Sequence, residues 1–269
     1  MKKFLAATTI AASVFALAAC GGNEEEENKI VVGASAGLHD LILEQAQPIL
    51  EKEGIDLDIT TYTEYVMPNQ DLESGEIDAN YFQHQPYLDQ QIAESGYDFV
   101  SLGAIHVEPM GLYSSKYDKV EDIPEGGTII ISNSVAEQGR ILSLLETAGL
   151  IKLDPAVDKV AARLDDIVEN PKNLTIDADS NAEILVQYLN NDEGDAIVIN
   201  ANFIIDAGLN PSEDAIALEG SESAYGNIIT VRAEDKDNEA LNRLVEVLQS
   251  EEIQNFILEE WEGTVIPVK

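Results

Sequence analysis

The sequence predicts an α/β fold with largely parallel sheets. Short runs of β-branched residues alternate with segments whose apolar residues recur at helical spacing, and such alternation is typical of sheets covered by helices. A glycine directly follows several of the helical segments, as it commonly does at helix ends. Hydrophobic residues make up 45% and charged residues 25% of the 269 residues, so the chain can bury a sizeable core.

The individual elements follow from local patterns. Residues 29–34 are rich in β-branched side chains and favour a strand. Leu38, Ile42 and Ile49 then recur at helical spacing, and Gly54 follows the last turn as a stop signal. The later strands are expected over residues 56–61, 128–132, 196–199 and 228–231, and the later helices over residues 85–95, 138–148, 182–189, 239–248 and 252–261. No Pro- or Ser-rich linker divides the body, which is compatible with two lobes joined by several chain crossings.

The N-terminus has the pattern of a bacterial lipoprotein signal. Two lysines precede an apolar run over residues 4–19 that is too short for a comfortable permanent membrane span. Cys20 is the only cysteine, and it lies between small residues and Gly21, as in a lipobox. The alternative is a plain signal peptide with a chance cysteine. We expect residues 1–19 to be a signal peptide, Cys20 to carry lipid, and residues 20–28 to form an acidic tether.

The charge excludes some classes of function. A formal net charge of −36 argues against nucleic-acid binding through basic patches. An acidic body is also repelled by anionic lipid, so the anchor at Cys20 is expected to hold the protein to the outer face of the cell membrane. Acidity spread through the body is typical of adaptation to high salt or high pH.

No motif for catalysis is recognisable. The sequence lacks a P-loop, a dinucleotide-binding G-x-G-x-x-G and a G-x-S-x-G nucleophile elbow. With 51 carboxylates, acidic pairs occur everywhere and say nothing about acid–base chemistry. His39, His84 and His106 form no H-x-x-x-H pair, so a zinc site would need them to converge with carboxylates. We therefore expect no enzyme activity, no cofactor and no metal.

Polar segments occur where ligands bind in α/β folds. Residues 80–88 place aromatic rings between amides and a histidine at a strand-to-helix junction, and residues 132–140 and 199–203 each follow a buried strand. Ligands of open α/β sheets bind beyond the carboxyl ends of strands. Amides, a histidine, aromatic rings and an arginine suit a small zwitterion with an apolar tail.

These segments carry a resemblance to a known family. Residues 29–269 resemble the methionine-binding lipoproteins, the substrate-binding subunits of ABC importers for methionine. The matching segments are DANYFQHQPYLDQ at residues 78–90, QGR at 138–140, GLIKL at 149–153, ENPKNL at 169–174, VIN at 198–200 and YGN at 225–227.

The resemblance implies an architecture and partners. It implies a two-lobed periplasmic-binding-protein fold, each lobe a largely parallel sheet flanked by helices, with the ligand in the interlobe cleft. Residues 29–111 and 228–269 would form lobe I, and residues 112–227 lobe II. A membrane permease and its cytoplasmic ATPase would be the partners.

The resemblance also implies the ligand-binding residues, which are Tyr65, Phe82, His84 and Tyr87 on one lobe, with Arg140, Asn200 and, across the cleft, Asn227. Arg140 would hold the carboxylate of the ligand, the asparagines would orient its amino and carboxylate groups, and the rings would wall its side-chain pocket.

Two segments depart from the family pattern. The turn at residues 132–136 lacks the usual prolines, and residues 179–185 lack a Leu-Pro-Arg stretch. Methionine is the expected ligand, and a different amino acid or a short peptide stays open. A secreted hydrolase or an adhesion lipoprotein is the alternative from another class.

Overall fold

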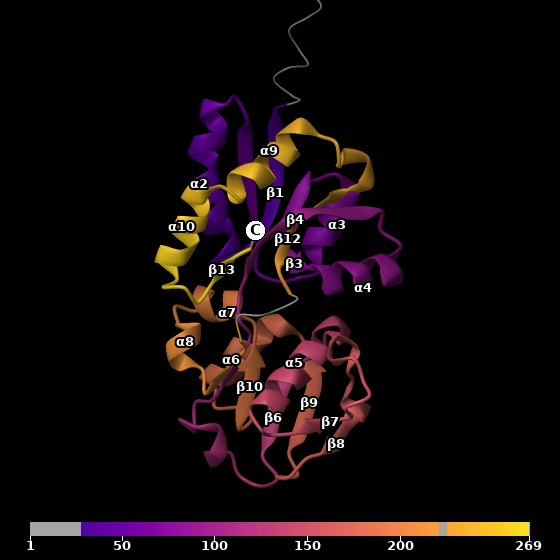
Figure 1. Cartoon of the computed structure of the whole chain (residues 1–269), viewed down its shortest axis with the longest axis vertical. Coiled ribbons are helices and arrows are strands. Elements are labelled where there is room, and N and C mark those ends of the chain that lie inside the picture. The colour runs from indigo at the N-terminus through magenta and orange to yellow at the C-terminus, as the bar shows by residue number, and fades with distance from the viewer. Residues whose placement is uncertain (1–27, 221–224, 269) are drawn as a thin grey trace, which may run out of the picture.

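The computed structural model describes residues 28–220 and 225–268. They form two halves along the long axis of the molecule, which we call lobe I (upper in Figure 1) and lobe II (lower). The expected signal peptide, Cys20 and residues 20–27 of the expected tether lie outside the described residues. Within the described ranges, no helix has both the length and the apolar character needed to cross a membrane.

Lobe I is organised around a six-stranded sheet. Its strands are β1 (Lys29–Ser35), β2 (Asp56–Tyr62), β3 (Ala79–His84), β4 (Phe99–Val107), β12 (Asn227–Arg232) and β13 (Ile266–Pro267). Their spatial order is β13-β4-β12-β3-β1-β2. Strand β1 is parallel to β2 and β3, whereas β12 is antiparallel to both of its neighbours and β13 is antiparallel to β4.

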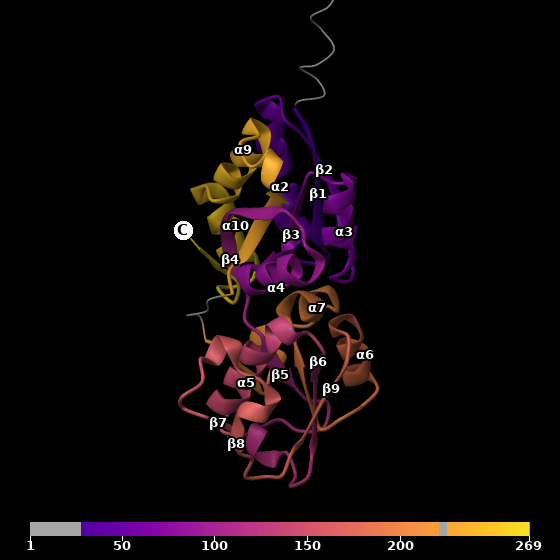
Figure 2. The same cartoon turned by 90° about the vertical axis from the view of Figure 1, so that its right-hand side faces the viewer.

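Helices cover both faces of this sheet (Figure 2). One face carries α2 (His39–Lys52), α9 (Glu239–Leu248) and α10 (Glu251–Glu260), and the other carries α3 (Met67–Ser74) and α4 (Gln85–Ser95). Ile42, Leu244 and Ile257 belong to the apolar cluster under the first face. Leu72 and Leu88 belong to the smaller cluster under the second. The buried apolar residues of these helices therefore face the sheet.

Lobe II repeats this plan on a smaller sheet. Its strands are β5 (Gly111–Tyr113), β6 (Thr128–Ser132), β9 (Thr175–Ser180), β10 (Ala196–Ile199) and β11 (Ala217–Leu218), in the spatial order β11-β5-β10-β6-β9. Its helices are α5 (Val135–Thr147), α6 (Leu185–Asn190), α7 (Ala201–Asp206) and α8 (Pro211–Asp214). A small hairpin of β7 (Lys152–Leu153) and β8 (Ile167–Glu169) completes the lobe.

Both sheets are mixed, which corrects the expectation of largely parallel pairing. Strands β3 and β10 run toward the other lobe and end at the interlobe edge, whereas β12 and β5 begin there, since Asn227 pairs with His84 and Gly111 with Ile199. A strand by which the chain enters a lobe starts at the edge where the other strands end. It is therefore antiparallel to them. The alternation of strands and helices along the sequence does not reveal this difference in strand direction.

Most predicted elements are present with small shifts at their ends. The bounds of β6, β10, α4 and α9 are confirmed without change. Helix α5 begins three residues earlier than expected, at Val135. Helix α3 was missed because it is mostly polar and buries only Pro68, Asn69 and Leu72.

The chain crosses between the lobes after β4 and again between β11 and β12. Gly111 pairs in the sheet of lobe II and Asn227 in that of lobe I. The expected boundaries assigned each of these two residues to the opposite lobe.

Candidate functional site

The structure brings all seven predicted binding residues to one cavity between the lobes. They are Tyr65, Phe82, His84, Tyr87, Arg140, Asn200 and Asn227. The cavity lies where β3, β6 and β10 end, as expected for an α/β fold. Two carboxylates that sequence reasoning did not select, Glu108 and Glu137, also line it.

Aromatic rings form one wall of the cavity. The ring centroid of Phe82 lies 5.9 Å from those of Tyr65 and Tyr87, and Phe203 of α7 lies 4.9 Å from Tyr65. The Tyr87 hydroxyl donates to the Tyr65 carbonyl at 3.1 Å, which holds the two rings together. This wall can contact an apolar side chain or a thioether.

His84 joins the two lobes. It ends β3 and caps α4, because its Nδ1 accepts the backbone N–H of Tyr87 at 3.2 Å. Since Nδ1 accepts, the proton lies on Nε2, which donates to Glu137 on α5 of lobe II. The backbone geometry of the strand-to-helix turn thereby fixes the imidazole in the direction of lobe II.

Glu137 is a buried carboxylate held in its charged form. Burial alone would raise its pKa, but the charge and hydrogen bond of His84, the charge of Arg140 and the Asn200 amide outweigh burial and lower the pKa to about 2. Asn200 Nδ2 donates to Glu137 Oε2 at 3.3 Å. Both carboxylate oxygens of Glu137 are therefore engaged.

Arg140 already has a carboxylate partner. Its Nε and Nη2 donate to Glu219 Oε2 at 2.9 and 2.6 Å, and Nη2 also donates to the Glu108 carbonyl at 2.7 Å. The third nitrogen, Nη1, faces Glu137 Oε2 at 3.9 Å. Arg140 is only 4% exposed and its guanidinium lies 4.8 Å from the ring centroid of Tyr225. Sequence reasoning missed Glu219, which lies 79 residues away.

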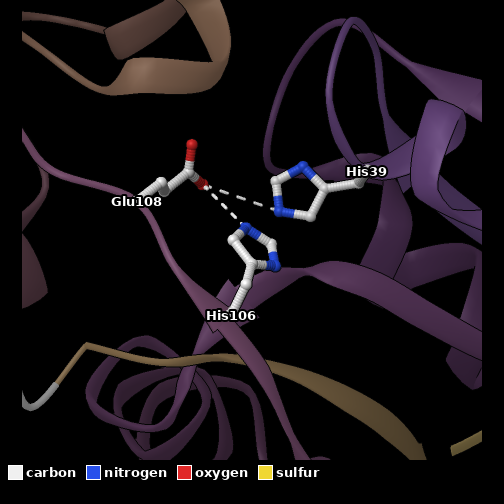
Figure 3. A group of neighbouring side chains, drawn as sticks. All are labelled: His39, His106 and Glu108. Atoms are coloured by element: carbon white, nitrogen blue, oxygen red, sulfur yellow. Dashed lines mark ion pairs between the residues drawn. The ribbon is translucent and has the colours of Figure 1, made fainter. Parts of the chain in front are cut away.

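Three side chains meet beside the cavity (Figure 3): His39 of α2, His106 of β4 and Glu108, of which Glu108 lines the cavity. One potential ligand atom from each lies within 4.8 Å of the others. Glu108 Oε1 is 3.6 Å from His39 Nε2 and 4.0 Å from His106 Nε2. All three are buried, and they are the one group in the described residues with the spacing to hold a metal ion. His84 does not join them.

Burial is the main influence on the pKa values of Glu108, His39 and His106. It raises the pKa of Glu108 to about 7, although Arg140, the Asn227 amide and the Asn202 backbone N–H favour the charged form. Burial also lowers the pKa of His39 to about 4 and that of His106 well below its usual range. Both imidazoles are therefore neutral at pH 7, and neither supplies a positive charge to Glu108.

The raised pKa predicts how Glu108 affects stability. The folded protein binds this proton more tightly than the unfolded chain, so the contribution of Glu108 is fully present below pH 4.5 and is lost as the pH rises through about 7. As the pH rises from 4.5 to 8, we expect the unfolding free energy of Glu108→Gln to increase by about 3 kcal/mol relative to that of wild type. Urea denaturation at both pH values measures this difference. A constant difference would contradict it.

The lobes contact each other around the cavity. The Tyr65 hydroxyl donates to Asn202 Oδ1 at 2.6 Å, in addition to the bond between His84 and Glu137. Gly37 of lobe I lies against α7 with φ +82°, and a Cβ there would be 2.8 Å from the Cα of Asp206. Glycine is required at this close approach.

The family of the chain follows from its sequence over almost its whole length. Residues 30–269 match the model of the NlpA lipoprotein family. The chain belongs to this family. The chain is 43% identical to the methionine-binding lipoprotein MetQ of Bacillus subtilis, over 100% of this chain and 99% of the relative. The resemblance to methionine-binding lipoproteins is thus confirmed.

Solved structures of similar proteins confirm the two-lobed α/β fold of this chain. A nutrient-binding protein of Burkholderia cenocepacia, solved bound to methionine, is 40% identical, with a TM-score of 0.83 over 89% of this chain and 100% of that chain. A periplasmic substrate-binding protein of an ABC transporter from Coxiella burnetii is 37% identical, with a TM-score of 0.83 over 89% of this chain and 100% of that chain.

Proposed function

We propose that this protein is an extracytoplasmic, lipid-anchored substrate-binding protein that captures methionine and delivers it to an ABC transporter. The observation that carries the proposal is the convergence of seven residues, chosen from the sequence, on one interlobe cavity. Support also comes from the relatives, since one is called a methionine-binding lipoprotein and another was solved with methionine bound. The membrane permease and its ATPase would be the partners, and lipid on Cys20 would keep the protein at the membrane.

The chemistry of the cavity suits methionine. The wall of Tyr65, Phe82 and Tyr87 would contact the thioether side chain. Arg140 would hold the carboxylate through Nη1, because Nε and Nη2 are occupied by Glu219 and the Glu108 carbonyl. Asn200 and Asn227 would orient the amino acid head group.

We propose that binding closes the two lobes on the ligand. The crossings after β4 and before β12 would act as the hinge, close to the expected boundaries, with Gly111 moving with lobe II and Asn227 with lobe I. Contacts such as Tyr65 to Asn202 would then belong to the closed state.

Calorimetric titration of the mature protein tests the proposal. The ligands are both stereoisomers of methionine, the other amino acids and methionine-containing dipeptides. We expect methionine to bind at one site per chain and more tightly than the other amino acids. Binding of a dipeptide or another amino acid in preference to methionine would reassign the ligand. Absence of binding by all of them would contradict the proposal.

A further inference from the structure

We propose that Glu108 accepts the α-ammonium group of the ligand and restricts the site to ligands with a free amino group. This inference rests on the proposed function, because it assumes an amino acid in the cavity. It adds a residue that neither the sequence motifs nor the family resemblance selected.

Glu108 differs from Glu137, the other carboxylate named at the cavity, in its hydrogen bonds. Both oxygens of Glu137 are engaged by His84 and Asn200. Glu108 Oε1 accepts from Asn227 Nδ2 at 3.1 Å. Its Oε2 is buried and has no hydrogen-bond partner among the described residues, although the Asn202 backbone N–H is near the carboxylate and favours its charged form. A buried carboxylate oxygen without a donor is costly unless a ligand supplies one.

The position of Glu108 matches the head group of an amino acid. Arg140 Nη2 donates to the backbone carbonyl of Glu108, so the cation for the ligand carboxylate lies beside the residue that would take the ammonium. The α-carbon of an amino acid carries both charges, so the two protein groups have to be neighbours. In Figure 3, one Glu108 oxygen points to the two histidines and the other points away from them.

A network of side chains orients Glu108. Asn227 donates to Glu108 through Nδ2, and its Oδ1 accepts from His39 Nε2 at 3.2 Å. Because His39 Nε2 carries the donated proton, this nitrogen has no lone pair for a metal ion. The arrangement therefore favours an ammonium donor over a metal ion as the cation that Glu108 binds.

Binding is expected to be coupled to a proton. The titratable groups facing Glu108 are His39 of α2, His106 of β4, Arg140 and Glu137 of α5, Tyr65, Tyr81 of β3 and Tyr113 of β5, together with the amides of Asn202 and Asn227. Glu108 is partly protonated near pH 7, and an incoming ammonium favours the carboxylate. Its proton would pass to the buffer, so affinity should rise with pH across this range.

The test compares methionine with 4-(methylthio)butanoate, which has the same carboxylate and thioether but no amino group. We expect wild type to bind methionine at least ~30-fold more tightly than this analogue. Glu108→Gln should weaken the binding of methionine by a similar factor and leave the affinity for the analogue within about threefold of that of wild type. The matched control is Glu169→Gln, an exposed carboxylate on β8 that should change neither affinity.

A second readout does not depend on the variant. Titration of wild type in buffers of different ionisation enthalpy should reveal release of up to roughly half a proton per methionine near pH 7. If Glu108→Gln binds methionine within about threefold of wild type, Glu108 is not the acceptor. The proposed function would survive this result. Zinc binding that His39→Ala abolishes and methionine displaces would instead identify a metal site and overturn the inference.

Discussion

Arg140→Ala is expected to weaken methionine binding on the order of thirty- to several-thousand-fold, a loss of about 2–5 kcal/mol. The substitution leaves the ligand carboxylate buried without a cation, in a protein whose net charge of −36 opposes an anionic group. Arg140 is one of four arginines and lies at the cavity with Nη1 facing it. Calorimetry with methionine measures the loss.

The variant should also be less stable than wild type. Arg140 is buried and its charge balances Glu137 and Glu219, so its removal affects the folded protein as well as the site. Stability should be measured by urea denaturation alongside affinity, so that loss of binding is not confused with unfolding. Arg140→Lys should recover part of the affinity, since lysine keeps the charge but not the planar donors.

Arg243→Ala is the matched control for this prediction. Arg243 is exposed on α9 of lobe I and pairs with Glu53 and Glu246 away from the cavity. It should leave methionine binding unchanged. If Arg140→Ala binds methionine within about threefold of wild type, another donor holds the carboxylate.

Glu137→Gln is expected to reduce the free energy of unfolding by about 3 kcal/mol at neutral pH. The pKa of Glu137 is lowered to about 2 from 4.5, so the folded state binds this proton more weakly than the unfolded chain. The contribution is present above pH 4.5 and is lost as the pH falls toward 2. The difference between variant and wild type should therefore shrink on acidification.

Urea denaturation at pH values from about 7 to 3 follows this difference. Glu108→Gln should show the opposite pH dependence, because burial raises the pKa of Glu108. Glu169→Gln, which removes an exposed carboxylate paired with Lys152, should show little of either effect. A Glu137→Gln variant as stable as wild type at neutral pH would show that its bonds to His84 and Asn200 contribute no net stability.

Local sequence patterns located several polar segments at the cavity, and the family resemblance supplied the individual binding residues. The binding residues lie in segments that directly follow strands or precede them, such as His84 after β3 and Asn200 after β10. Strand ends can be identified from short-range patterns, and the ends of neighbouring strands meet at one edge of a sheet. For this reason the side chains chosen from sequence line a single cavity.

The hydrogen-bond and ion-pair partners could not be predicted in the same way. Arg140 bonds to Glu219 across 79 positions, and His39 bonds to Asn227 across 188. With 51 carboxylates in the chain, no local pattern distinguishes the few that become buried. Glu137 was missed although it lies within a segment selected from the sequence, and Glu108 was missed although it lies between His106 and Pro109.

The sequence by itself determined most of the longer helices and strands, the family and the group of residues at the cavity, because these depend on patterns within short stretches of chain. Only the tertiary structure decided the mixed parallel and antiparallel pairing of the strands and the pairing of Arg140 with Glu219. It also decided the burial of Glu108 beside two neutral histidines. These features depend on which distant segments are brought together and how completely they exclude water. Burial of that kind raises the pKa of Glu108, while the neighbours of Glu137 lower its pKa in the same cavity.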